Sequence, residues 1–114
     1  MSGIKLSRRL QHIASFVPVS SRVADIGSDH GLLVCYLVSQ GIAEMAVAGE
    51  VALGPFAATE KQVKACDLDD RISVRLGDGL AVLKEPVDVV VIAGMGGELI
   101  ISILSKGRKE LGQV

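Results

Sequence analysis

Four short apolar runs recur along the chain, and consecutive runs are separated by segments that can form helices. The last run, VDVVVIA, is almost wholly apolar, which is typical of a central parallel strand buried on both faces. Strands that alternate with helices form βαβ units with right-handed crossovers. The sequence therefore predicts an α/β fold built on a doubly wound parallel sheet. The expected strands are Arg22–Ile26, Met45–Glu50, Arg71–Leu76 and Val87–Ala93.

The segments around these strands show helical patterns. In KLSRRLQHIASFV, Leu6, Leu10 and Ile13 recur at helical spacing, and Pro18 ends this N-terminal helix. Further helices are expected from about His30 to Ser39, over residues 54–66, over Leu80–Leu83, and after the glycine turn at 94–97, where GMGGELIISILSKG begins the last helix.

Composition limits the classes of protein that fit. The chain has 114 residues, 49% hydrophobic and 22% charged, which is typical of one globular domain, placed here at residues 1–114. The net charge of −1 gives no overall basic field that would attract nucleic acid, so an RNA-binding surface would have to be local.

Cys35 and Cys66 are expected to be reduced core thiols, and no His/Cys cluster has metal-site spacing. The longest apolar run, Val89–Met95, is too short to cross a bilayer, and no signal peptide is expected. A cytoplasmic protein with no metal and no membrane partner is predicted.

The turn VADIGSDHGLL after the first strand indicates the kind of ligand. A dinucleotide fingerprint needs glycine where this chain has Asp25 and His30, and a carboxylate repels a pyrophosphate, so a nicotinamide oxidoreductase is disfavoured. The spacing of Asp25, Gly27, Asp29 and Gly31 instead resembles the first motif of class I S-adenosylmethionine-dependent methyltransferases. That cofactor carries an ammonium and a sulfonium, and a carboxylate can face both cations.

Two more acids end the next two strands. Glu50 is placed where an acid can accept both ribose hydroxyls, and Asp78 can accept from an exocyclic amine such as adenine N6. Each also has a simpler interpretation, Glu50 as a helix-entry acid and Asp78 as a turn residue. After the fourth strand, IAGMGG carries no side-chain acceptor for an amine, and its glycines allow close backbone approach.

With IGSDH, AGEV, ISVR, GDGL and IAGMGG in order, the chain resembles the bacterial tRNA (adenine-22-N1)-methyltransferase family (TrmK) over essentially its whole length. The resemblance implies a Rossmann-like domain, S-adenosylmethionine as cofactor, and methyl transfer to N1 of an adenine in tRNA. With Asp25 and Gly31 of the glycine turn, the cofactor-binding residues it implies are Gly27, Ser28, Asp29, His30, Glu50, Val51, Asp78, Gly79, Ala93 and Gly94.

Asp29 is the predicted catalytic residue, because a carboxylate near adenine N1 can stabilise the positive charge that methylation creates. Its alternative roles are to bind the methionine ammonium or to cap the helix expected at His30. His30 itself is expected to start that helix or to pack, rather than to act as a base.

The chain departs from the family in two ways. The family's aromatic after Asp-His is absent here or shifted to Tyr36. The family also continues with further strands and C-terminal helices, so we expect a sheet truncated after about four strands, in the order 3-2-1-4, with little or no methyl transfer. The fourth strand would then be an exposed apolar edge, open to self-association.

Two alternatives stay open at this point. The chain could be a non-catalytic cofactor-binding module that another chain completes. The basic residues Lys5, Arg8, Arg9, Arg108 and Lys109 could form a tRNA-facing patch or an ordinary solvated surface.

Overall fold

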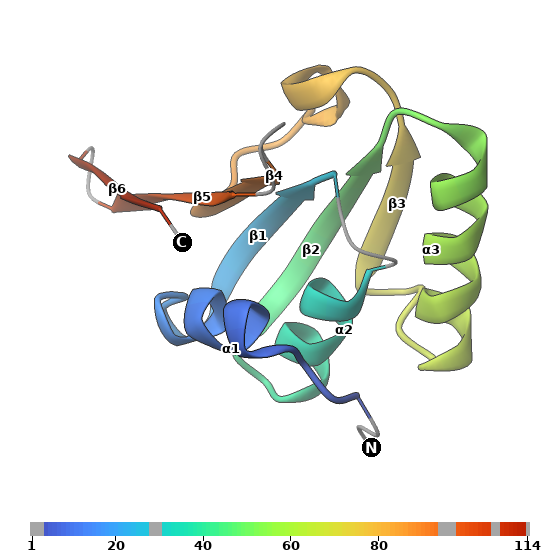
Figure 1. The fold of residues 1–114 in the computed structure, drawn as a ribbon, viewed down its shortest axis with the longest axis horizontal. Coiled ribbons are helices and arrows are strands. Elements are labelled where there is room, and N and C mark those ends of the chain that lie inside the picture. The colour runs from blue at the N-terminus through green and yellow to red at the C-terminus, as the bar shows by residue number, and fades with distance from the viewer. Residues whose placement is uncertain (1–3, 28–30, 94–97, 106–107, 114) are drawn as a thin grey trace.

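The computed structural model describes residues 4–27, 31–93, 98–105 and 108–113, and the surroundings of side chains as far as residue 104 (Figure 1). The helices are α1 (Arg8–Ser15), α2 (Leu32–Ser39) and α3 (Leu53–Ala65), with one 3-10 turn, η1 (Gly79–Val82). The strands are β1 (Ser21–Ile26), β2 (Ala43–Glu50), β3 (Ile72–Leu76), β4 (Val89–Ala93), β5 (Leu99–Ser105) and β6 (Arg108–Gln113).

All strands belong to one sheet in the order β3-β2-β1-β4-β5-β6. The first four are parallel, and the order reverses between β1 and β4, which is the switch point of a doubly wound sheet. The predicted fold class and the predicted order of the parallel strands are therefore confirmed. α1 to α3 agree with the expected helices, although α2 begins at Leu32 rather than His30 and the helix expected at 80–83 is a single 3-10 turn.

The prediction of a last helix after the glycine turn is wrong. Residues 99–105 form β5, which runs antiparallel to β4 and pairs Ile101 with Val91, and β6 pairs with β5 in turn. The three isoleucines of LIISILS favour a strand, and β4 supplies an edge of backbone groups that need hydrogen-bond partners. The sheet thus has six strands rather than about four. β4 is paired along its whole length, so the exposed edge expected there, on which self-association was predicted, is covered.

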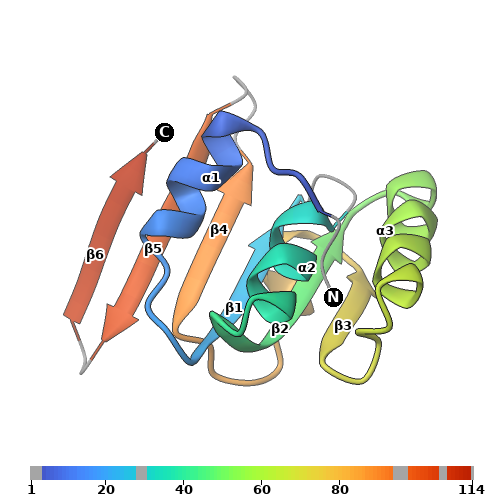
Figure 2. The ribbon, with the colours of Figure 1, turned by 90° about the horizontal axis from the view of Figure 1, so that it is seen from below.

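The three α-helices pack on the same face of the sheet (Figure 2). Their buried side chains, among them Ile13, Leu37 and Val63, meet Val23 and Val91 from the strands, so the core is aliphatic as expected. The connection that contains η1 covers part of the opposite face, through Val82 packed on Val47 and Ile26. Among the described residues, no helix is both long and apolar enough to cross a membrane.

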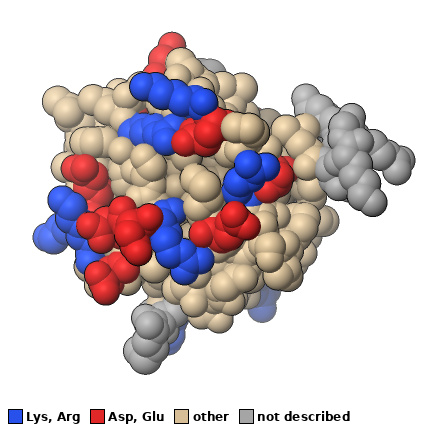
Figure 3. Space-filling view, turned by 180° about the vertical axis from the view of Figure 1, so that it is seen from behind, with Lys and Arg blue, Asp and Glu red and all other residues tan. Residues whose placement is uncertain are grey.

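Two arginine–carboxylate pairs tie the connection before β4 to the sheet. Arg75 of β3 donates to both carboxylate oxygens of Glu85, at 2.7 and 2.8 Å, and also to the carbonyl of Val82. Arg22 of β1 contacts Asp88 through its side chain at 3.3 Å and its backbone N–H at 2.8 Å. On the face seen from behind, basic and acidic side chains are interspersed rather than gathered by sign (Figure 3). This view shows no single-sign basic surface.

Candidate functional site

The carboxyl ends of β1, β2, β3 and β4 meet at one edge of the sheet, called the carboxyl edge below. In the register, Ile26 lies opposite Gly49 of β2 and Ile92 of β4. Gly27, the next residue, therefore lies between the ends of these two strands, and its N–H donates to the carbonyl of Gly49 at 2.9 Å. The predicted convergence of the strand ends is confirmed.

Gly27 satisfies two requirements at this junction that a side chain would violate. Its φ is +78°, a conformation that residues with a Cβ rarely adopt, and an added Cβ would lie 3.3 Å from the Cβ of Ala93. The glycine lets β1 turn out of the sheet while leaving its own backbone exposed. A ligand can consequently approach the main chain between β1 and β4.

Asp25 is buried at the carboxyl edge, with 5% of its surface exposed. Because side chains alternate along a strand, it shares the helix-covered face with Val23, two residues before it. It forms part of a cavity of about 200 Å³ between α1 and the ends of β1 and β4. The residues lining the cavity are Ser7, Arg9, Leu10, Asp25, Gly27, Val91, Ala93 and Leu99.

Glu50 is the second buried carboxylate of the carboxyl edge, also 5% exposed. It shares the helix-covered face with Ala48, which lies opposite Asp25 in the register. The hydroxyl of Thr59, from α3, donates to Glu50 Oε2 at 3.0 Å. A buried polar group needs such a partner, so α3 helps to hold this carboxylate in place.

Thr59 also contacts the start of α2. Gly31 has a φ of +73°, and a Cβ added there would lie 3.0 Å from Cγ2 of Thr59. This fully buried threonine thus touches both the end of the glycine turn and Glu50. Thr59 is not among the site residues predicted from the sequence. The signal was present, since Thr59 and Val63 form the buried stripe of α3 at a spacing of four, and a hydroxyl in such a stripe requires a polar partner.

Asp78 lies beyond β3, at the outer end of the carboxyl edge. Its side chain is exposed, and its carbonyl accepts from the N–H of Ala81 in the η1 turn. The Arg75–Glu85 pair holds the connection that η1 begins, and this guanidinium lowers the pKa of Glu85 from 4.5 to about 2, chiefly through its hydrogen bonds. Asp78 is therefore carried by an anchored segment but is itself open to solvent.

The predicted site residues fall into three groups. Seven of them lie along the carboxyl edge: Asp25, Gly27, Glu50, Val51, Asp78, Gly79 and Ala93. Gly31 is buried one step further in, at the N-cap position of α2, and makes no side-chain cap hydrogen bond. Ser28, Asp29, His30 and Gly94 lie outside the described residues.

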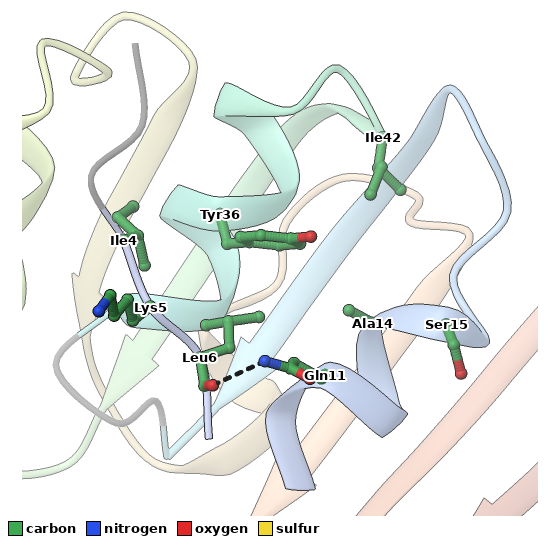
Figure 4. Close-up of a pocket in the computed structure, with 8 residues that line it drawn as sticks. All are labelled: Ile4, Lys5, Leu6, Gln11, Ala14, Ser15, Tyr36 and Ile42. Atoms are coloured by element: carbon green, nitrogen blue, oxygen red, sulfur yellow. Dashed lines mark hydrogen bonds between the residues drawn. The ribbon is translucent and has the colours of Figure 1, made fainter. Parts of the chain in front are cut away.

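A second, larger cavity of about 530 Å³ lies between the N-terminal segment, α1 and α2 (Figure 4). Tyr36 and Gln11 line it, and Gln11 donates from Nε2 to the carbonyl of Leu6 at 3.0 Å. None of its lining residues belongs to the cavity around Asp25. Tyr36, the residue to which the family's aromatic is shifted if it is not absent, thus lines this second cavity and not the cavity around Asp25.

The described part of the chain contains no group of three His, Cys, Asp or Glu that could hold a metal ion. Cys35 and Cys66 are both free thiols. Cys35 is buried, and burial, with a smaller contribution from neighbouring Cys66, raises its pKa to about 12. Cys35 therefore stays protonated, which agrees with the expected core role.

A family model described as a methyltransferase domain matches residues 6–114. The chain belongs to this methyltransferase family. It is 48% identical over 112 residues to the tRNA (adenine(22)-N(1))-methyltransferase of Bacillus subtilis (strain 168), a match that covers 97% of this chain and 47% of that protein. The resemblance expected from the motifs is therefore confirmed.

Solved structures of methyltransferases superpose on the same part of the chain. The B. subtilis m1A22 tRNA methyltransferase TrmK gives a TM-score of 0.78 at 47% identity, over 81% of this chain and 40% of that one. Streptococcus pneumoniae Sp1610, in complex with S-adenosyl-L-methionine, gives 0.76 at 44% identity, over 80% and 44% of the two chains. The chain thus spans less than half the length of these methyltransferase relatives.

Proposed function

We propose that this chain provides the cofactor-binding part of an enzyme that transfers a methyl group from S-adenosylmethionine to N1 of an adenine in tRNA, at position 22. One observation carries the proposal. Two buried carboxylates, Asp25 and Glu50, lie on the same face of the sheet at the carboxyl edge, next to the exposed turn at Gly27. The similarity to a tRNA (adenine(22)-N(1))-methyltransferase supplies the substrate and the position.

The donor set fits the proposed cofactor. Asp25 can face the methionine ammonium, and Glu50 can accept hydrogen bonds from both ribose hydroxyls. The exposed main chain at Gly27 lies at the same edge of the sheet as these two carboxylates. Asp78, exposed beyond β3, can accept from an exocyclic amine such as adenine N6. When bound, the cofactor supplies an electrophilic methyl group on its sulfonium.

The contribution of the chain's own residues to catalysis is mainly positioning. Adenine N1 is a neutral nucleophile, and holding it in line with the methyl group can lower the barrier by about 7–11 kcal/mol. We retain Asp29 as the residue that would stabilise the charge developing on the adenine, an assignment that rests on the sequence. The activity of the isolated chain is expected to be little or none. A protein that acts on tRNA is expected in the cytoplasm.

The first experiment is calorimetric titration of S-adenosylhomocysteine into the purified chain. Glu50→Gln keeps an acceptor for the Thr59 hydroxyl but loses one acceptor oxygen, and we expect it to weaken binding by roughly tenfold or more. Glu44→Gln, an exposed carboxylate at the other end of β2, is the matched control and should leave affinity unchanged.

Two results would contradict the proposal in different ways. Absence of binding to the folded wild-type chain would mean that the carboxyl edge is not a cofactor site. Equal weakening by both substitutions would mean that the effect is one of net charge. Robust turnover on tRNA by this chain would contradict only the expectation that it transfers little or no methyl. Binding without turnover is the expected result, and it also fits the alternative of a non-catalytic cofactor-binding module that needs a further part.

A further inference from the structure

The larger cavity, called the Tyr36 cavity below, lies outside the carboxyl edge and takes no part in the proposed cofactor site. Its lining residues come from the N-terminal segment, from α1 and α2, and from Ile42, the residue before β2 (Figure 4). Its volume of about 530 Å³ falls within the roughly 300–1,000 Å³ of a typical small-molecule site. The Tyr36 cavity is therefore large enough for a ligand of its own.

The Tyr36 ring gives the cavity a flat apolar surface. The side chain is half-buried, because it packs against the core on one side and lines the cavity on the other. In Figure 4 the ring extends from α2 over Leu6 and into the space beside α1. An aromatic ring that is open on one side can stack on a nucleobase, and every base has a face that suits it.

The polar groups of the lining suit the edge of a base. Gln11 donates from Nε2 to the carbonyl of Leu6 at 3.0 Å, which holds its amide at the wall, and the amide has a further N–H and a carbonyl oxygen. The Ser15 hydroxyl donates to the carbonyl of His12 at 2.6 Å, so its oxygen can still accept. The cavity thus presents both donors and acceptors to a planar polar ligand.

The charge of the lining favours an anionic ligand. Lys5 is exposed at the rim, and in Figure 4 its ammonium is directed away from the Tyr36 ring. None of the described residues that line the cavity is a carboxylate. An aromatic ring for the base and a cation for the backbone phosphate are the two parts of a typical single-stranded nucleic acid site.

Helix α1 separates the Tyr36 cavity from the cavity around Asp25. Leu10 lines the cavity of Asp25, whereas Gln11 and Ala14 line the Tyr36 cavity. Because an α-helix with its side chains is about 10 Å across, a ligand in the Tyr36 cavity does not overlap the proposed cofactor site. It can still belong to the same RNA molecule that presents the reactive adenine.

We propose that the Tyr36 cavity binds a nucleotide of the RNA substrate other than the adenine that receives the methyl group, with its base against Tyr36 and its phosphate at Lys5. The inference rests on the proposed function, which supplies an RNA substrate. It makes Tyr36 and Lys5 RNA-binding residues that are remote from the methyl transfer. Stacking on Tyr36 accepts any base, so this contact adds affinity and not sequence preference.

The test uses a short dye-labelled single-stranded RNA without adenine, so that the probe does not imitate the methylated base. Its affinity for the chain is measured by fluorescence anisotropy at several salt concentrations. Tyr36→Leu is expected to weaken binding about tenfold or more, and Tyr36→Phe, which keeps the ring, should lose less. Lys5→Gln should reduce the slope of log affinity against log salt by about 0.7, the value for one phosphate of a single strand. Lys61→Gln, an exposed lysine of α3, is the matched control and should leave the slope unchanged.

A second measurement reports on the cavity directly. Tyr36 is the only tyrosine of the chain, so its ring proton signals can be followed by NMR without ambiguity. They should shift when the RNA is added to the wild-type chain and to Lys61→Gln. RNA binding that is insensitive to Tyr36→Leu and Lys5→Gln, or that leaves the Tyr36 signals in place, would overturn the proposal, as would the absence of RNA binding. Uridine 5′-monophosphate bound as tightly as the RNA would assign the cavity to a free nucleotide and overturn the RNA contact.

Binding of S-adenosylhomocysteine separates this proposal from the proposed function. Its affinity should be the same for the wild-type chain, Tyr36→Leu and Lys5→Gln, since the two cavities share no lining residue. Equal weakening of both ligands by Tyr36→Leu would mean that the ring acts only through the packing of α2, and would overturn the RNA contact. Absence of S-adenosylhomocysteine binding, with RNA binding that depends on Tyr36, would overturn the proposed function and leave the Tyr36 cavity as an RNA site.

Discussion

Carboxylates occur in two contrasting settings, at the carboxyl edge and on the connection that leads into β4. At the carboxyl edge, Asp25 and Glu50 are almost fully buried, and Glu50 accepts from a neutral hydroxyl. On the connection, Glu85 and Asp88 have a third or more of their side chains exposed, and each pairs with an arginine of a strand. An exposed, arginine-paired carboxylate ties segments together at modest energetic gain. A buried carboxylate costs solvation free energy, which a cationic or hydroxyl-bearing ligand can offset. The contrast predicts that changes at the carboxyl edge alter ligand affinity, and that changes on the connection alter only stability.

The largest effect is expected at Gly31, which joins the glycine turn to α2. Gly31→Ala imposes a left-handed backbone on alanine and places its Cβ 3.0 Å from Thr59, so we expect a loss of about 2–3 kcal/mol in unfolding free energy. Gly41→Ala is the control, with a φ of +74° but no atom within 4 Å, and should cost only about 1 kcal/mol. Urea denaturation measures both. Equal losses of unfolding free energy in the two variants would mean that the Thr59 side chain moves aside without an energetic cost.

Substitutions of Thr59 test whether its hydrogen bond to Glu50 contributes to ligand binding. Thr59→Val keeps the shape and the methyl group but removes the hydroxyl, and should weaken S-adenosylhomocysteine roughly tenfold because Glu50 loses a donor that orients it. Thr59→Ser, which keeps the hydroxyl, should lose less. On a Glu50→Gln background the Thr59→Val effect should shrink, since the two residues act together. Full additivity would show that Thr59 acts on the fold and not through Glu50.

The Arg75–Glu85 pair gives a pH-dependent contribution to stability. The Glu85 pKa is lowered from 4.5 to about 2 in the folded chain, so its ionised form favours folding above pH 4.5, and this contribution is lost as the pH falls toward 2. The unfolding free energies of wild type and Glu85→Gln should therefore differ at neutral pH and converge between about pH 4.5 and 2. Urea midpoints as a function of pH measure this, with exposed Glu44→Gln as the control. A difference that persists at pH 2 would mean that the carboxylate charge is not its source.

The smallest effect is expected for Asp88→Asn at the start of β4. Hydrogen bonds from Arg22 lower the pKa of Asp88, and both side chains are more than a third exposed. An asparagine oxygen can still accept from the Arg22 N–H, so only a slight loss of stability is expected, and it should diminish at high salt. Affinity for S-adenosylhomocysteine should stay unchanged. A clear loss of affinity would break the contrast between the two settings.

Much of the carboxyl edge could be predicted because it depends on local order along the chain. Each apolar run is followed by a glycine or an acid, and the ends of parallel strands necessarily meet at one edge. This order correctly predicted that Asp25, Gly27 and Glu50 come together. The hairpin of β5 and β6 could not be predicted in this way. The apolar residues of ELIISILS fit both a helix and a strand, and the pairing with β4 decides between them.

The sequence by itself determined the alternation of strands and helices and the parallel order around β1, and it predicted a cationic rather than a pyrophosphate ligand. These follow from apolar periodicity, from glycine at a turn and from the sign of a carboxylate, which are properties of neighbouring residues. Only the tertiary structure decided that Thr59 meets both Gly31 and Glu50, and that α1 brings Arg9 to the cavity of Asp25. Such contacts join elements far apart in sequence. They depend on how helices pack on a sheet face, and no pattern within a single segment encodes that.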